Sequence, residues 1–254
     1  MHRQSGFSLV ELAIVILIMG LILGGLAMPL SVQRDNARYR EAQELLTVVE
    51  NSIQGFALVN GHLPCPATPA SGGFALASAG GCAVPHGFVP ASTLGLAGPR
   101  NDDNLLLDPW SVPVRYSVSA VDIDGDGNWD FTAPGELKDV GLANLAPDLV
   151  VCNTATGSSA TACASPLATL SASAPFLLHS RGKNNATGAS PDEVENAGAS
   201  LGGGVSGTSY PVASDIVFVS RRQSAQPGSE FDDILTWTAP ASLYHRLVAA
   251  GQLP

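Results

Sequence analysis

One long apolar run near the amino terminus constrains the fold more than any other feature of the sequence. From Leu12 to Met28 no residue carries a charge. About 20 residues of α-helix, rising about 1.5 Å each, cross a hydrocarbon core of about 30 Å. The run is too long for the apolar core of a cleaved secretory signal, and no small-residue cleavage site follows it. The sequence therefore predicts a membrane-spanning helix over residues 7–30 and a globular domain over residues 31–254.

A single carboxylate, Glu11, stands at the start of this run. A charged side chain inside a bilayer costs about 2.5–3.5 kcal/mol on insertion scales, so such a residue usually has a partner and a task. One interpretation is a plain anchor in which Glu11 lies among the lipid headgroups. The other is that Glu11 has a partner of its own, because an unpaired charge is costly to bury.

The residues around Glu11 resemble a known processing signal. A short basic leader ends in Gly6, Phe7 follows, Glu11 is the fifth residue after the Gly6–Phe7 bond, and a long apolar helix comes next. This order resembles the class III signal of type IV pilins and type II secretion pseudopilins. The resemblance implies that a prepilin peptidase removes the leader, residues 1–6, and methylates the new amine of Phe7. It also implies that Glu11 pairs with the Phe7 amine of a neighbouring subunit during fibre assembly.

The same resemblance implies a location and a set of partners. The expected partners are other pilin or pseudopilin subunits, the prepilin peptidase and an inner-membrane assembly platform. The expected location is the bacterial inner membrane, as a single-pass protein with its globular domain in the periplasm, and then a periplasmic pseudopilus or a cell-surface fibre.

The formal charge of −10, from 12 basic and 22 acidic residues, excludes a general nucleic-acid-binding surface.

A helical pattern continues beyond the apolar run. Apolar residues at spacings near three, four and seven predict an amphipathic helix over residues 31–60, and these residues are Ala37, Leu45, Leu46, Val49, Ile53 and Phe56. Asn60-Gly61 is a helix-stop signal, with Pro64 beyond it. The sequence therefore predicts one helix from about Phe7 to Asn60, whose first half enters the membrane or the fibre core.

Residues 61–238 are expected to form loops and a sheet. Val114, Tyr116 and Val118 alternate with Arg115 and Ser117, which predicts a half-buried strand within Val112–Val121. Further strands are predicted at Leu149–Asn153, Phe176–Ser180, Asp215–Ser220 and Ile234–Thr238, and a last helix at residues 239–250. The fold class is α+β, and the resemblance implies a pilin-like form of it: a long N-terminal helix spine packed on an antiparallel sheet, with disulfide-stapled loops.

Four cysteines lie in two sequence-local pairs. Pairing Cys65 with Cys82 and Cys152 with Cys163 needs the shortest loop closures of the three possible connectivities. Each bridge would staple a loop rich in Gly, Ala and Ser, and an exported domain sees an oxidising compartment in which such bridges persist. Four buried free thiols are the alternative.

An acidic loop follows the strand predicted at Val112–Val121. Its oxygen-bearing side chains occupy loop positions 1, 3, 5, 7 and 9, with glycine at position 6, as in an EF-hand calcium loop; the residues are Asp122, Asp124, Asp126, Asn128 and Asp130. Position 12 is Ala133 where an EF-hand has glutamate, and a strand precedes the loop in place of a helix. Asp130 or Glu136 could supply the missing oxygens. A calcium site is expected, and a metal-free Asp/Asn/Gly turn is the alternative.

Three blocks in the rest of the chain resemble pseudopilin sequences. They are Asp108-Pro109-Trp110, Ser180-x-Gly-Lys-Asn184 and Phe231-Asp-Asp-Ile-x-x-Trp237. The resemblance implies calcium binding in the loop between the last two, with Asn184, Asp192, Asn196 and Asp232 as candidate ligands and a solvated loop as the alternative.

No catalytic constellation is visible. The histidines His62, His86, His179 and His245 are scattered, without metal-ligand spacing, so the chain is expected not to be an enzyme. The expected function is that of a structural fibre subunit, a pseudopilin or minor pilin. The alternative is a tip-located adhesin or cargo-binding module, in which the insertions Pro64–Pro109 and Cys152–Ser214 recognise a surface or a cargo.

Overall fold

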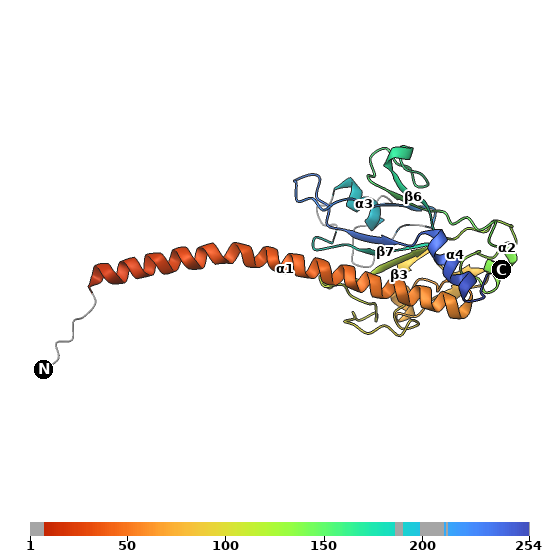
Figure 1. Ribbon diagram of the computed structural model, residues 1–254, viewed down its shortest axis with the longest axis horizontal. Coiled ribbons are helices and arrows are strands. Elements are labelled where there is room, and N and C mark those ends of the chain that lie inside the picture. The colour runs from red at the N-terminus through yellow and green to blue at the C-terminus, as the bar shows by residue number, and fades with distance from the viewer. Residues whose placement is uncertain (1–7, 186–189, 199–210, 212, 254) are drawn as a thin grey trace. The chain divides into compact units, whose positions relative to one another are not determined.

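The computed structural model describes residues 8–185, 190–198, 211 and 213–253, except for the side chains of residues 22–31. Contacts within the chain define two compact units, Met1–Glu41 and Ala42–Pro254. The first helix, α1, runs from Leu9 to Asn60 and contributes residues to both units (Figure 1). It ends at the predicted stop, where Gly61 adopts a φ of 73°, a left-handed conformation that favours glycine.

Most of the predicted membrane span, residues 7–30, falls in the first part of α1. Within the residues that the structure describes, no helix combines the length and the mean hydropathy needed to cross a membrane.

One stripe of α1 is fully buried within the second unit. Leu46, Val49 and Ile53 are buried as predicted, and Ala42 and Ala57 extend the stripe at the same helical spacing. Three other predicted members differ: Leu45 and Phe56 are half-buried and Ala37 is exposed. Glu50 and Gln54 lie beside the stripe, and both hydrogen-bond to the Thr238 hydroxyl, at 2.7 and 3.1 Å.

The first sheet is antiparallel and has four strands in the order β3-β4-β7-β9. The strands are β3 (His86–Phe88), β4 (Arg115–Val118), β7 (Phe176–Ser180) and β9 (Ile234–Trp237). Three of them, β4, β7 and β9, lie within the predicted ranges, whereas β3 was not predicted.

A second sheet has three strands in the order β6-β5-β8. They are β5 (Leu149–Cys152), β6 (Thr169–Ala174) and β8 (Val217–Val219). β5 pairs antiparallel with β6 and parallel with β8, so the molecule has a mixed sheet in addition to the predicted antiparallel one. A two-stranded hairpin joins β1 (Ala77–Ser78) to β2 (Gly81–Cys82).

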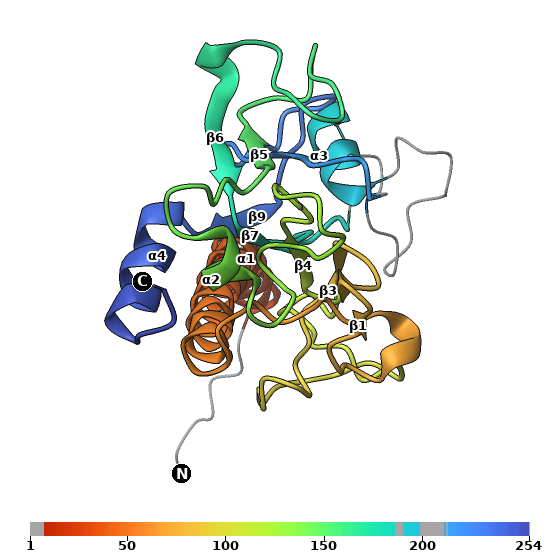
Figure 2. The ribbon, with the colours of Figure 1, turned by 90° about the vertical axis from the view of Figure 1, so that its right-hand side faces the viewer.

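The two sheets form stacked layers, with the second-unit part of α1 on the far face of the first sheet (Figures 1 and 2). Leu149, Ala174, Leu177 and Phe218 form a buried cluster between the sheets, and Leu235 and Trp237 pack against it. Strand residues that pair directly across a sheet share a face, so Arg115 and Ser117 on β4 share the face of His179 and Leu177 on β7.

This layering corrects the prediction that β4 is half-buried. Arg115 and Ser117 were predicted to face solvent, but each is 3% exposed. The second sheet covers the face on which they lie. The alternating pattern identified the strand correctly, and it could not show that a further layer packs on the polar side.

The remaining elements in the described part of the chain are three short helices and two 3₁₀ turns. They are α2 (Glu136–Val140), α3 (Pro191–Ala197), α4 (Pro240–Ala249), η1 (Pro69–Ser71) and η2 (Pro166–Ala168). α4 lies beside the end of α1 (Figures 1 and 2), and Gln252, just after it, donates to the Leu58 carbonyl at 3.1 Å. Leu243 and Leu247 of α4 are buried, whereas Val248 is 43% exposed.

Both sequence-local disulfides are present, Cys65–Cys82 and Cys152–Cys163, and the described residues include no free cysteine. Much of the segment Pro64–Pro109 packs into the core of the second unit. Ala67 and Phe88 exchange backbone hydrogen bonds of 2.8 Å and form a buried cluster with Leu105. Backbone pairing of this kind can bury small residues even where the sequence has no periodic apolar pattern to predict their burial.

Candidate functional site

Glu11 forms a capping box at the start of α1. Its carboxylate accepts the Ser8 backbone N–H at 2.9 Å, and the Ser8 hydroxyl accepts the Glu11 backbone N–H at 3.2 Å. A capping box satisfies two of the N–H groups that lack partners at a helix start, and an acid there also favours the helix dipole. The spacing Ser8-x-x-Glu11 is visible in the sequence, so this second role of Glu11 could have been predicted.

The predicted cleavage and methylation site, Gly6 and Phe7, lies outside the described residues. The part of α1 that follows is apolar, apart from Glu11, over its described residues Leu9–Leu21. Its large apolar side chains between Leu9 and Leu21 are between 46% and 86% exposed. Apolar surface of this extent on one segment indicates contact with a membrane or with other protein chains.

The acidic loop folds around its own carboxylates. Asp122 accepts the backbone N–H groups of Gly125 and Gly127 at 2.7 and 2.9 Å. Asp124 accepts the N–H of Asp126 at 3.3 Å. Aspartate side chains in turns commonly accept nearby backbone N–H groups in this way.

The structure brings together part of the predicted calcium set and adds two acids from α2. One group of carboxylates contains Asp122, Asp124 and Asp130. A second contains Asp124, Asp126, Glu136 and Asp139. Sequence reasoning considered Glu136 and missed Asp139, although the spacing of three places both acids on one helix face.

Asn128 bonds to the Asp126 carboxylate through two donors. Its amide donates to the Asp126 carboxylate at 2.7 Å, and its backbone N–H donates to the other oxygen of the same carboxylate at 2.7 Å. The side chain therefore serves to hold the turn.

A second acidic cluster lies among α3 and the chain before β9. Glu193, Asp232 and Asp233 bring their carboxylates together, and Asn184 donates to Glu193 at 3.1 Å. Burial, opposed by the Asp232 N–H and reinforced by the neighbouring acids, raises the pKa of Glu193 to about 6. Asp192 is not a member of this cluster. Its carboxylate forms a salt bridge of 2.6 Å with Arg221.

Asp233 is the centre of a buried polar network. The Nε2 atom of His179 lies 3.1 Å from its carboxylate, and both side chains are 1% exposed. Asn196 donates to Asp233 at 2.7 Å and exchanges two hydrogen bonds with the Val219 backbone on β8. Burial lowers the pKa of His179 despite the opposing effect of Asp233. The network therefore joins the first sheet to the second through α3.

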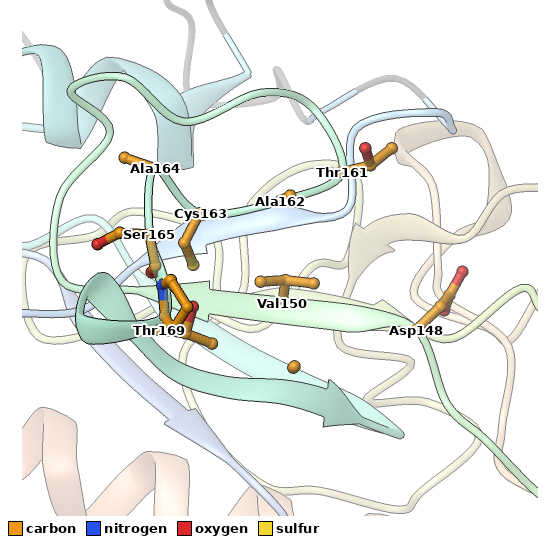
Figure 3. Close-up of a pocket in the computed structure, with 10 residues that line it drawn as sticks. Asp148, Val150, Thr161, Ala162, Cys163, Ala164, Ser165 and Thr169 are labelled. Atoms are coloured by element: carbon orange, nitrogen blue, oxygen red, sulfur yellow. Dashed lines mark hydrogen bonds between the residues drawn. The ribbon is translucent and has the colours of Figure 1, made fainter.

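An open groove of about 820 Å³ lies over β5 and β6, beside the Cys152–Cys163 disulfide (Figure 3). Val150 and Cys163 form part of its wall, and Thr161, Ser165 and Asp148 contribute oxygen atoms. The groove carries one acid and no basic residue in its lining, so its surface suits an uncharged or weakly cationic ligand.

Comparison with known proteins identifies the amino-terminal segment. Residues 1–27 match the family model described as the prokaryotic N-terminal methylation motif. Searches of curated proteins and of solved structures gave no match. The chain therefore carries the prepilin signal of type IV pilins and pseudopilins in residues 1–27.

Proposed function

We propose that the protein is a pseudopilin or minor pilin, a structural fibre subunit that a prepilin peptidase processes and that assembles through the first part of α1. The observation that carries the proposal is the methylation motif over residues 1–27. The exposed apolar side chains between Leu9 and Leu21 support it, because they need a membrane or neighbouring subunits to cover them.

Before assembly, the proposed anchor is the segment of residues 7–30 in the bacterial inner membrane, with residues 31–254 in the periplasm. On an assembly platform the helices of successive subunits would then pack head to tail. Such a heterologous contact does not close on itself and therefore builds a helical fibre. In the fibre, Glu11 would exchange its contact with Ser8 for the methylated amine of a neighbour's Phe7.

Type II secretion is the favoured system, because the Asp-Pro-Trp and Phe-Asp-Asp blocks resemble pseudopilin sequences. The Asp-Pro-Trp and Ser-x-Gly-Lys-Asn blocks that resemble pseudopilins meet in the core, where the Ser180 hydroxyl donates to Asp108 at 2.6 Å. Asp108 also accepts the backbone N–H groups of Trp110 and Val112, both at 2.9 Å. These contacts support a pilin-like fold in which both blocks stabilise the sheet.

A tip-located binding module is the second candidate. The observation that favours it is the groove beside Cys163, which lies in the predicted insertion Cys152–Ser214. Binding of a surface or a cargo there would need few copies at one end of a fibre, whereas a shaft subunit must be present along its whole length.

Copy number in isolated fibres separates the two candidates. For a shaft subunit, we expect quantitative mass spectrometry of purified fibres to find this chain as an abundant component, at roughly ten or more copies for each copy of the rarest subunit. The control is a fibre preparation from a strain that lacks the prepilin peptidase, in which the chain should be absent. One or two copies per fibre, labelled at the end by antibody, would instead support the tip module.

A further inference from the structure

The acids of residues 122–139 form two adjoining groups that share Asp124. Within each group, one carboxylate oxygen from every member lies within 4.8 Å of the others. Calcium binds oxygen ligands at about 2.3–2.6 Å, so two ligands of one ion are at most about 5 Å apart. Each group therefore has the span of a single calcium coordination sphere.

Each group contains one buried carboxylate with an unsatisfied oxygen. Asp130 is fully buried; its Oδ1 accepts the Ile123 N–H at 3.2 Å, and its Oδ2 has no hydrogen-bond partner among the described residues. Glu136 is 9% exposed, and its Oε2 also has none within the described part of the chain. Both residues belong to the carboxylate groups, so these side chains are directed toward the exposed acids.

Such an arrangement is costly without a cation. A buried carboxylate is unfavourable unless hydrogen bonds or an opposite charge compensate it. The salt bridges His179–Asp233 and Arg221–Asp192 lie elsewhere in the chain.

We propose that this cluster binds two calcium ions in adjoining subsites. The first subsite uses Asp122, Asp124 and the buried Asp130. The second uses Asp124, Asp126, Asp139 and the buried Glu136, so that Asp124 bridges the two ions. An all-oxygen site with several carboxylates suits a hard cation, and calcium tolerates this irregular geometry better than magnesium does. The site differs from an EF-hand, because α2 supplies the ligands that Ala133 cannot.

Titration calorimetry tests the proposal on the full-length chain, purified in detergent and stripped of metal with a chelator. We expect two calcium ions per chain for the wild type. We expect one ion for Asp130→Asn and one for Glu136→Gln, because each substitution removes the buried ligand of a single subsite. A stoichiometry of zero or one for the wild type would overturn the proposal.

Two controls separate this site from other acids. Glu193→Gln changes the second acidic cluster, and Asp102→Asn removes an exposed acid; both variants should still bind two ions. Loss of an ion in Glu193→Gln, with two retained in Asp130→Asn, would place the metal in the other cluster and contradict the proposal.

Thermal unfolding distinguishes a ligand from a purely structural residue. Calcium in excess should raise the Tm of the wild type by about 5 °C, since a ligand that binds only the native state stabilises it. In chelator, Asp130→Asn should be at least as stable as the wild type, because it removes a buried uncompensated charge. Equal destabilisation of this variant with and without calcium would show a structural role and would refute the assignment of Asp130.

Discussion

Replacing Glu11 with valine is expected to block incorporation into fibres while the chain still accumulates in the membrane. In the proposed assembly, the amine of each Phe7 is buried against the Glu11 carboxylate of a neighbouring subunit. Removing one partner of a buried ion pair costs about 3–5 kcal/mol, because the other charge is left uncompensated. This corresponds to a loss of roughly 100-fold or more in incorporation, measured by quantitative immunoblotting of sheared fibres against whole membranes.

The capping box gives this experiment a matched control. Glu11→Gln keeps a side chain that can accept the Ser8 N–H, since glutamine also serves at this position of a capping box. It removes only the charge. If the ion pair governs assembly, Glu11→Gln should fail as Glu11→Val does. Normal incorporation of Glu11→Gln, together with failure of Glu11→Val, would show that helix capping is the role of Glu11 and would contradict the pairing.

Replacing Asp233 with alanine is expected to destabilise the second unit by about 3–5 kcal/mol. The substitution leaves His179 and Asn196 without the buried acceptor that both contact. It also removes the negative charge that raises the pKa of the buried Arg115 and so partly offsets the effect of its burial. For a domain of this size the expected fall in Tm is roughly 10 °C, measured by circular dichroism or calorimetry.

Two further variants serve as controls for the stability of Asp233→Ala. Asp102→Ala removes an exposed acid and should change stability by no more than about 0.5 kcal/mol. Asp233→Asn keeps an oxygen for the Asn196 amide and loses the charge, so its Tm should lie between those of the wild type and Asp233→Ala. A Tm for Asp233→Ala equal to that of Asp102→Ala would show that the network contributes little to the coupling of the two sheets.

Local signals in the sequence predicted a large part of this fold. The end of α1 at Asn60 was predictable because Gly61 takes a left-handed conformation that ends helices. The strand Phe176–Ser180 was predicted with its observed bounds, since it is a short apolar run between turns. Both disulfides followed from loop closure, which depends on sequence separation alone.

Long-range packing explains most of what was missed. β6 is built from Thr, Leu, Ser and Ala, a composition with little strand signal, and it forms because β5 offers an edge to pair with. The burial of Arg115 depends on the second sheet, which no local pattern reveals. Asp139 was overlooked because α2 is too short to have an amphipathic pattern, and only folding brings it to Asp124.

The mass of the amino-terminal peptide of the native protein tests the central claim most directly. If residues 1–27 act as a prepilin signal, peptide mass spectrometry of protein isolated from fibres will show a chain that begins at N-methylated Phe7, whereas Gly6→Val will retain residues 1–6. Native material that begins at Met1, or an unmethylated Phe7 in assembled fibres, would contradict the account.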